Sequence, residues 1–360
     1  MSTRRPRPLR GAIVGFGNVA VEGHVPAWQQ NRQFTIVAVC DTSEARLEVA
    51  AKLLPNAHRY TSLDELLKTE RLDFVDIATP PASHTALTLQ VLAKRLHVLC
   101  EKPLTTHWEE CRQIRSAASA SRTIVFTAHN WKYAPIFRTA KRTLRRNDIG
   151  SVTHVRLETI RTTPPSDADG TGAWRLDPAL AGGGIMVDHG WHAFYLARHL
   201  ADAEPIAISA VTSQRKFTTA GVEDTAECTL DLANGAQAEI VLTWAGEARK
   251  NAGTIVGTLG SLTIADRTLI TTIGERAPVE THFAQALSAG SYHPDWFAAM
   301  LEDFHAEVHD PNVRGESFRE AEACCRLIEW GYRSSASGGT RCVLDEPLPA
   351  GRSTDVGAGE

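Results

Sequence analysis

A short apolar segment that ends in a glycine turn is the feature that most constrains the fold of this chain. Residues 9–14 suit a buried strand, and residues from about 21 to 29 have helical character. Between them lies the turn Gly15-Phe16-Gly17-Asn18-Val19-Ala20, with the spacing G-x-G-x-x-A. The first glycine permits a tight turn, the second lets the backbone approach a pyrophosphate, and the small third residue lets helix pack on strand. The segment predicts a dinucleotide site at the start of a parallel sheet.

The next expected strand ends in an acid. Residues 34–40 are apolar and lead to Asp41, which lies 21 residues beyond Ala20. A carboxylate at this distance binds the ribose 2'-hydroxyl of a dinucleotide and repels a 2'-phosphate. NAD is therefore favoured over NADP. Arg46 lies nearby in the sequence and weakens that preference, so both cofactors stay open.

Strands and helices continue to alternate as far as residue 130. Helices are expected over residues 43–54, 63–68, 83–94 and 108–120, and strands over residues 74–78, 96–100 and 124–128. This alternation predicts a parallel, doubly wound sheet, in which ligands bind beyond the carboxyl ends of the strands. Three successive strand ends carry Thr79-Pro80-Pro81, Glu101-Lys102-Pro103 and His129-Asn130. Lys102 would meet a bound molecule there, although residues 96–104 alone suit a solvated turn equally well.

The second half of the chain has a different pattern. Strands are expected over residues 152–160, 206–214, 226–232, 236–244 and 254–259, some of them joined by turns such as 233–235. Short turns force antiparallel pairing, so this half predicts an α+β domain on a large open, mostly antiparallel sheet. Helices are expected over residues 135–146, 295–309 and 317–335, and the polar loop 164–172 is placed to cover a site. The expected domains are 8–130 and 131–345, with disordered tails at 1–7 and 346–360.

A second chemical cluster follows the three glycines at positions 182–184. Asp188 and His192 are four residues apart, so on one helix they would share a face. A carboxylate beside an imidazole suits proton transfer near neutral pH. A structural hydrogen bond is the alternative, and a metal site lacks an evident third and fourth ligand. His189 and Trp191 are expected to be packing or rim residues.

Composition excludes several other classes of protein. The chain has 360 residues, 43% of them hydrophobic, and a net charge of -4, which suits two globular domains and argues against nucleic-acid or anionic-membrane surfaces. No apolar segment is long enough to span a membrane. The seven cysteines are scattered and odd in number, as expected of reduced thiols in a cytoplasmic protein.

Taken together, these motifs resemble one family of oxidoreductases. Over residues 9–343, the chain is similar to the glucose-fructose oxidoreductase, inositol dehydrogenase and rhizopine catabolism (Gfo/Idh/MocA) family. The motifs that carry the resemblance are the glycine turn, Asp41, Thr79-Pro80-Pro81 with His84, Glu101-Lys102-Pro103, Trp174-Arg175, and the three glycines with Asp188 and His192. The resemblance implies an N-terminal Rossmann domain and NAD(P)-dependent oxidation of a sugar or cyclitol hydroxyl. It also implies a homodimer or homotetramer formed through the C-terminal sheet. Two departures are Ala20 in place of a third glycine, and residues 129–132 in place of an aromatic-arginine stretch.

The resemblance also implies roles for individual residues. Lys102 and His192 would form the central catalytic pair with Asp188 beside them: His192 takes the hydroxyl proton, Lys102 stabilises the negative oxygen, and Asp188 orients the imidazole or holds a neighbouring hydroxyl. Asn130, Tyr133 and Arg175 are further substrate contacts, and no metal is expected. The expected cofactor contacts are Gly15, Phe16, Gly17, Asn18, Val19, Asp41, Thr79, Pro80, His84, Glu101, Lys102 and Asn130. Two alternatives remain: an NAD-dependent glycoside hydrolase of the same fold, and a non-catalytic nucleotide-binding sensor.

Overall fold

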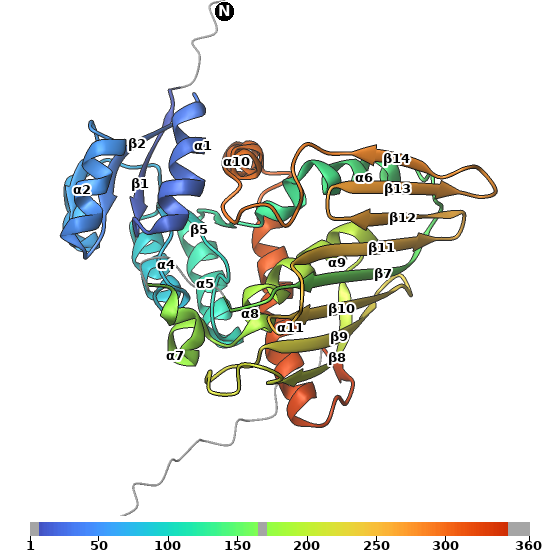
Figure 1. The fold of residues 1–360 in the computed structure, drawn as a ribbon. Helices are drawn as coiled ribbons and strands as arrows, with labels where there is room; N and C mark the ends of the chain where they lie inside the picture. The colour runs from blue at the N-terminus through green and yellow to red at the C-terminus, as the bar shows by residue number, and fades with distance from the viewer. Residues whose placement is uncertain (1–6, 165–170, 345–360) are drawn as a thin grey trace, which may run out of the picture.

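The computed structural model describes residues 7–164 and 171–344. They form two sheets that lie side by side, one parallel and one mostly antiparallel (Figure 1). The predicted fold class, a Rossmann domain followed by an α+β domain, is confirmed. The expected tails, apart from Arg7, and most of the loop 164–172 lie outside the described residues.

The N-terminal sheet is doubly wound. Its strand order is β3-β2-β1-β4-β5-β6, and every neighbouring pair is parallel. The order reverses between β1 and β4, which opens a crevice beyond their carboxyl ends. The strands are β1 (Leu9–Val14), β2 (Phe34–Cys40), β3 (His58–Tyr60), β4 (Phe74–Ile77), β5 (His97–Cys100) and β6 (Val125–Thr127).

Helices cover both faces of this sheet. Alternate residues of β1 point to opposite sides, so Val14 packs with the helices on one face and Ile13 with those on the other. On the first face lie α3 (Leu63–Thr69), α4 (His84–Ala93) and α5 (Trp108–Ser121). On the second lie α1 (Val25–Gln30), α2 (Glu44–Leu53) and, from far along the chain, α10 (Pro294–His309).

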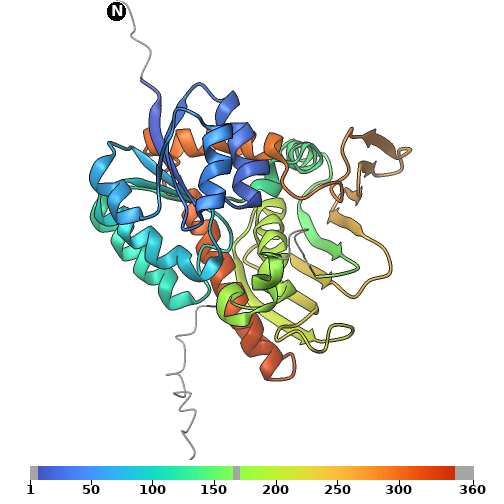
Figure 2. The same ribbon diagram turned by 60° about the vertical axis from the view of Figure 1, so that its left-hand side comes forward.

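The late helix α10 thus completes the N-terminal domain, although the sequence suggested the C-terminal one. Phe297, Met300 and Phe304 pack in one cluster with Leu99 and Phe126 of the parallel sheet. Figure 2 shows this orange helix beside the blue helices of the N-terminal half. The six-residue α1 is too short to cover that face alone, so the remaining apolar surface is buried by α10.

The C-terminal sheet has nine strands in the order β14-β13-β12-β11-β7-β10-β9-β8-β15. Only the pair of β7 and β10 is parallel among these described strands. Helices α9 (Gly190–Ala201) and α11 (Glu316–Ala336) pack on one face, and no helix of the described residues covers the opposite face (Figure 1). The strands are β7 (Val152–Ile160), β8 (Pro205–Ser213), β9 (Thr225–Leu232), β10 (Gln237–Thr243), β11 (Lys250–Gly257), β12 (Gly260–Ala265), β13 (Thr268–Ile273), β14 (Val279–His282) and β15 (Cys342–Val343).

Local structure departs from the sequence prediction in two places. The helix after the glycine turn begins as a π-helical turn, η1 (Ala20–His24), and α1 follows with Pro26 in its first turn, where a missing N–H costs nothing. The strands β3 and β12 to β15 were not predicted: β3, β14 and β15 have only three, four and two residues, and in β12 and β13 polar residues interrupt the apolar ones. The remaining helices are α6 (Pro135–Arg145), α7 (Pro178–Ala181) and α8 (Ile185–Asp188), with 3-10 turns η2 (Pro81–Ser83), η3 (Asn130–Tyr133) and η4 (Thr171–Leu176).

Three other chemical features bear on function. All seven cysteines are free thiols, and six of them are buried. Within residues 7–164 and 171–344, no helix has both the length and the apolar character needed to cross a bilayer. The same residues contain no group of three or more His, Cys, Asp or Glu side chains arranged to hold a metal ion.

Candidate active site

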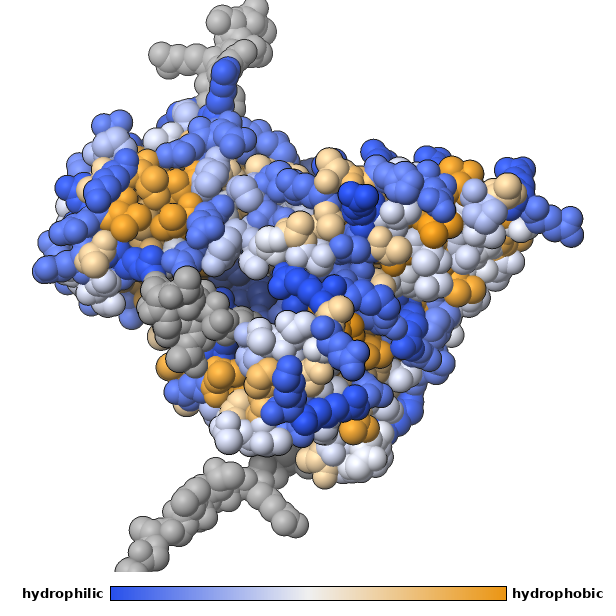
Figure 3. All heavy atoms as spheres, viewed as in Figure 1, coloured by the Kyte–Doolittle hydropathy of each residue, from blue (hydrophilic) through white to orange (hydrophobic). Residues whose placement is uncertain are grey.

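A cavity of about 380 Å³ lies between the two domains. Figure 3 shows it as a hollow near the centre of the molecule, surrounded mainly by hydrophilic residues. The carboxyl ends of β4 and β5 form one wall, and the loops and helix ends of the C-terminal domain form the other. Its charged and histidine side chains are His24, Glu101, Lys102, Arg161, Arg175, Asp188, His189, His192, Arg249 and His293.

The glycine turn has the geometry that a dinucleotide requires. Gly15 has a φ of +86°, and a Cβ atom there would lie 2.7 Å from the carbonyl oxygen of Ala78. A Cβ atom on Gly17 would meet nothing within 4 Å, so the backbone at this point is open to a ligand. Asp41 accepts hydrogen bonds from the amides of Phe16 at 2.6 Å and Ser43 at 2.8 Å. These residues fit a pyrophosphate at the turn and a ribose beside Asp41.

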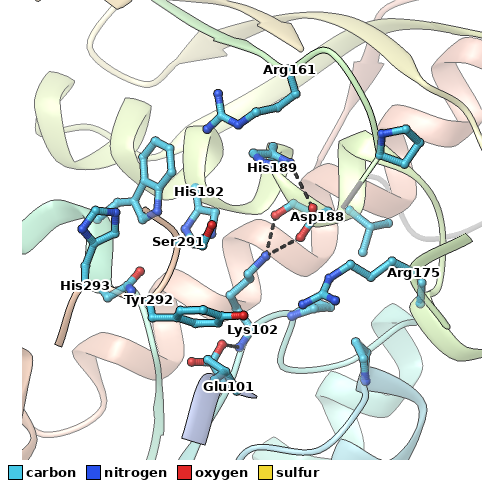
Figure 4. A pocket seen from close by; sticks show the side chains of 18 of the residues that line it. Glu101, Lys102, Arg161, Arg175, Asp188, His189, His192, Ser291, Tyr292 and His293 are labelled. Carbon is cyan, nitrogen blue, oxygen red and sulfur yellow. Dashed lines mark hydrogen bonds and ion pairs between the residues drawn. The ribbon is translucent and has the colours of Figure 1, made fainter. Parts of the chain in front are cut away.

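Lys102 joins the two domains through Asp188. Its Nζ lies 2.7 Å from Asp188 Oδ1 and 2.7 Å from the carbonyl oxygen of the same residue (Figure 4). Oδ2 of Asp188 lies 3.0 Å from His189 Nδ1, a close electrostatic contact without the alignment of a hydrogen bond. Burial raises the pKa of Asp188, but the nearby charges of Lys102 and His189 outweigh it and hold the pKa well below its usual range. Asp188 is therefore ionised at neutral pH.

The expected pair of Asp188 and His192 does not form. The helix is interrupted between them: α8 ends at Asp188 and α9 begins at Gly190, so the four-residue spacing no longer places both on one face. Nδ1 of His192 instead lies 2.8 Å from the hydroxyl of Tyr195, and its ring stacks on Trp131 at 4.9 Å. Burial, and then the charge of Lys102, lower the pKa of His192 well below its ordinary value. The imidazole is neutral at physiological pH.

A buried charge network supports the strand end before Lys102. His24 is 1% exposed, and its ring nitrogens lie 2.9 Å from Asp76 Oδ2 and 3.0 Å from Glu101 Oε1. Burial lowers the pKa of His24, but the two carboxylates outweigh it and raise the pKa to about 9. Trp28 also donates to Asp76, at 2.8 Å. The sequence did not single out His24. The one signal was Asp76, an acid inside the apolar strand β4, because a buried carboxylate needs a partner nearby.

Gly15, Phe16, Gly17, Asn18 and Asp41 form the dinucleotide turn and its acid outside this cavity, and three other residues proposed from the sequence do not line it either. The ring nitrogens of His84 lie 2.7 Å from the carbonyl oxygen of Pro103 and 2.8 Å from that of Thr79, so His84 braces two strand ends from within the core. Tyr133 donates to Asp303 at 2.6 Å and lines a different hollow, because the η3 turn directs it away. Pro80 is exposed between the lining residues Thr79 and Pro81.

Other proposed residues do reach the cavity. Asn130 lines it, and its Oδ1 is a buried acceptor with no partner among the described residues. The guanidinium of Arg175 lies 4.4 Å from the centre of the Trp174 ring, and both side chains line the cavity. Arg161, Arg249 and His293 were not expected, because they stand at strand and helix ends far apart in the sequence. His189, expected as a rim or packing residue, also lines the cavity, beside Asp188.

Comparison with known proteins identifies the family. The model of the oxidoreductase family with an NAD-binding Rossmann fold matches residues 9–129, and that of the GFO/IDH/MocA C-terminal domain matches residues 137–263. The chain belongs to the Gfo/Idh/MocA family. The resemblance inferred from the motifs is thereby confirmed.

Several curated relatives that match this chain are 26–29% identical to it over the aligned residues. Oxidoreductase P35 of Formosa agariphila is 29% identical over 192 residues, which is 53% of this chain and 60% of the relative. D-xylose 1-dehydrogenase (NADP(+)) 2 of Haloferax volcanii is 29% identical over 228 residues, 63% of this chain and 67% of the relative. About a third or more of each of these curated relatives is thus unmatched. The crystal structure of GenD2 from gentamicin A biosynthesis, in complex with NAD, superposes with a TM-score of 0.78 at 27% identity, covering 96% of this chain and 99% of GenD2.

Proposed function

We propose that this protein is a dehydrogenase that transfers a hydride between NAD(P) and a secondary hydroxyl of a sugar or related polyol. The observation that carries the proposal is that Lys102 and His192, from different domains, line one cavity at the carboxyl edge of a Rossmann sheet. The sugar substrate named for the Haloferax relative supports a sugar or sugar derivative, with cyclitols as the other class to test. NAD is favoured over NADP because a carboxylate after the second strand, such as Asp41, would repel a 2'-phosphate.

His192 is the proposed base. A secondary alcohol releases hydride readily only if its hydroxyl proton also leaves, so a neutral acceptor must lie within hydrogen-bond reach. If Nδ1 donates its proton to Tyr195, Nε2 is free to take the hydroxyl proton. The Tyr195 oxygen also accepts from the amide of Trp131 at 3.0 Å, and its two lone pairs accommodate both donors.

Lys102 is proposed to stabilise the substrate oxygen as negative charge develops on it. Asp188 then has a role that differs from the one inferred from sequence: it holds the ammonium group in place through its carboxylate and its carbonyl oxygen. Bound NAD supplies the hydride acceptor, C4 of its nicotinamide. Asn130, with its unpaired Oδ1, and Arg175 are the proposed further contacts to substrate or nicotinamide.

The experiment is a screen of sugars, sugar acids and inositols with NAD and NADP, following the absorbance of the reduced nicotinamide. We expect Lys102→Ala to lower kcat/KM on the best substrate by about 10³-fold, because it removes the stabilising charge and leaves Asp188 unpaired. Lys94→Ala, on an exposed position of the same domain, should keep full activity. Wild-type turnover in Lys102→Ala would reject the assignment.

The same screen separates the alternatives. A glycoside hydrolase of this fold would split a glycoside with no net change in nicotinamide absorbance, whereas a sensor would bind the dinucleotide and turn nothing over. We also propose that the open face of the C-terminal sheet joins two or four copies of the chain, which light scattering of the purified protein would measure. Cytoplasmic residence remains a proposal that rests on the free thiols.

A further inference from the structure

A buried arginine in the cavity wall has hydrogen-bond donors that the protein does not use. Arg161 follows β7 and is only 5% exposed. Its Nη1 donates to the carbonyl oxygens of Ile160 at 2.8 Å and Lys250 at 3.3 Å, and to Oδ1 of Asn251 at 3.0 Å. Within the described part of the chain, Nε and Nη2 have no partner, yet neither is sealed from solvent. Because Arg161 lines the cavity, this edge of the guanidinium is available to a ligand.

The charge of Arg161 also has no counter-ion within ion-pair distance among the residues that the structure describes. None of the described carboxylates forms an ion pair with it, and its bonds go only to uncharged oxygens. Among the described residues, the two carboxylates of the cavity wall are already engaged, Glu101 by His24 and Asp188 by Lys102. Burial, and then the neighbouring charge of Arg249, lower the pKa of Arg161 to about 10, so the guanidinium remains charged at neutral pH. A buried cation normally has an anionic partner.

Arg249 adds a second positive charge from the exposed rim. It precedes β11, lines the same cavity, and donates to the carbonyl oxygens of Ser288 at 2.8 Å and Gly290 at 3.1 Å. Figure 4 shows Arg161 on the side of the cavity that holds His189 and His192, away from Glu101. The dinucleotide turn contributes only Val19 of residues 15–19 to the cavity wall, so the pyrophosphate is not the missing anion.

We propose that the substrate is a sugar acid whose carboxylate binds the Nε and Nη2 edge of Arg161, with Arg249 adding positive charge at the cavity mouth. This inference rests on the proposed function and names its substrate class. The two N–H groups of that edge match the two oxygens of a carboxylate. A phosphate would offer the same oxygens, but Asp188 lies close enough to influence Arg161 and repels a dianion more than a monoanion.

The test compares D-glucuronate, D-glucose and D-glucose 6-phosphate, which differ only at C6, with D-gluconate and D-galacturonate as further sugar acids. We expect kcat/KM with NAD to be at least about 100-fold higher for the best sugar acid than for its neutral counterpart. Arg161→Gln should reduce that ratio by about 100-fold, because the carboxylate loses its charged two-pronged partner. Arg161→Lys keeps the charge but loses the pair of parallel N–H groups. It should restore only part of the preference for the sugar acid over the neutral sugar. Arg142→Gln, an exposed arginine on α6 outside this cavity, is the matched control.

Each outcome decides the inference. Equal use of neutral and acidic sugars, or a preference for the phosphate, overturns it while the dehydrogenase proposal stands. If Arg161→Gln unfolds at lower temperature, Arg249→Gln at the exposed rim gives the same test, with an expected loss of about 5-fold in the ratio. If no compound reduces the nicotinamide, the proposed function fails, and calorimetric titration of the NADH-bound protein with D-glucuronate still decides the anion site. Binding that is lost in Arg161→Gln supports the site, whereas binding that is absent or unchanged rejects it.

Discussion

The two walls of the cavity differ in how their charges are balanced. In the Rossmann wall, the carboxylate of Glu101 is satisfied nearby, by His24 and by the backbone amide of Lys102. In the C-terminal wall, Arg161 is bound only to uncharged oxygens. Under the proposed function, the Rossmann wall always meets the same cofactor, so fixed backbone positions are enough to bind it. Under the same proposal, the second wall selects the substrate, and the unpaired donors of Arg161 are the groups that would bind it.

Within the C-terminal wall, the largest effect is expected at His192. We expect His192→Asn to lower kcat/KM by about 10² to 10³-fold, the usual contribution of a general base. In the wild type, the acid-side limb of the pH profile should lie below pH 6.5, because burial and Lys102 lower the pKa of the imidazole. His282→Asn, exposed on β14, should leave the profile unchanged. An unaltered profile in His192→Asn would mean that another group takes the proton.

Next in size is the effect of His24 on stability. His24→Gln should lower the free energy of unfolding by about 3 kcal/mol at pH 6, because Asp76 and Glu101 lose their buried counter-ion. The pKa of His24 is raised to about 9 in the folded protein from 6.5. Its contribution is therefore fully present below pH 6.5 and is lost as the pH rises through 9. Denaturant unfolding between pH 6 and 10 should show this slope in the wild type and in His58→Gln, an exposed control, but not in His24→Gln.

A smaller effect is expected at the other end of the cofactor site. Asp41→Ala should lower the ratio of kcat/KM for NAD to that for NADP by about 10-fold, because the repulsion of a 2'-phosphate disappears. The lost bond to the Phe16 amide affects both cofactors equally and cancels in the ratio. Asp64→Ala, exposed on α3, is the control. An unchanged ratio would move cofactor selection to other residues, with Arg46 the first to test.

The smallest effect is expected at Tyr133, which lies outside the cavity. Tyr133→Phe should cost about 1 kcal/mol of unfolding free energy through the lost bond to Asp303 and leave KM unchanged. Tyr195→Phe, by contrast, should lower kcat, because the partner of His192 is removed. A raised KM in Tyr133→Phe would restore the role that the sequence suggested for this residue.

Local patterns were sufficient to predict much of this molecule. Asp41, Lys102, Asp188 and His192 all stand in short motifs at strand or helix ends, where chain direction alone decides which edge of the sheet they reach. The parallel and antiparallel halves followed from strand spacing and turn length, because these set whether a crossover fits. His24 had no such motif, since its role depends on Asp76 and Glu101, which lie 52 and 77 residues away.

By itself, the sequence determined the fold class and the position of the glycine turn, because these depend on periodicity and short spacings, and it supplied the residues that we propose for proton transfer. Only the tertiary structure decided that Asp188 holds Lys102 and not His192. The helix is interrupted at His189, so Asp188 and His192 do not share a helix face as their spacing suggested. The position of α10 on the Rossmann sheet and of Arg161 in the cavity wall depended on the tertiary structure too. Contacts between residues distant in sequence follow from the packing of whole elements, and no local pattern records them.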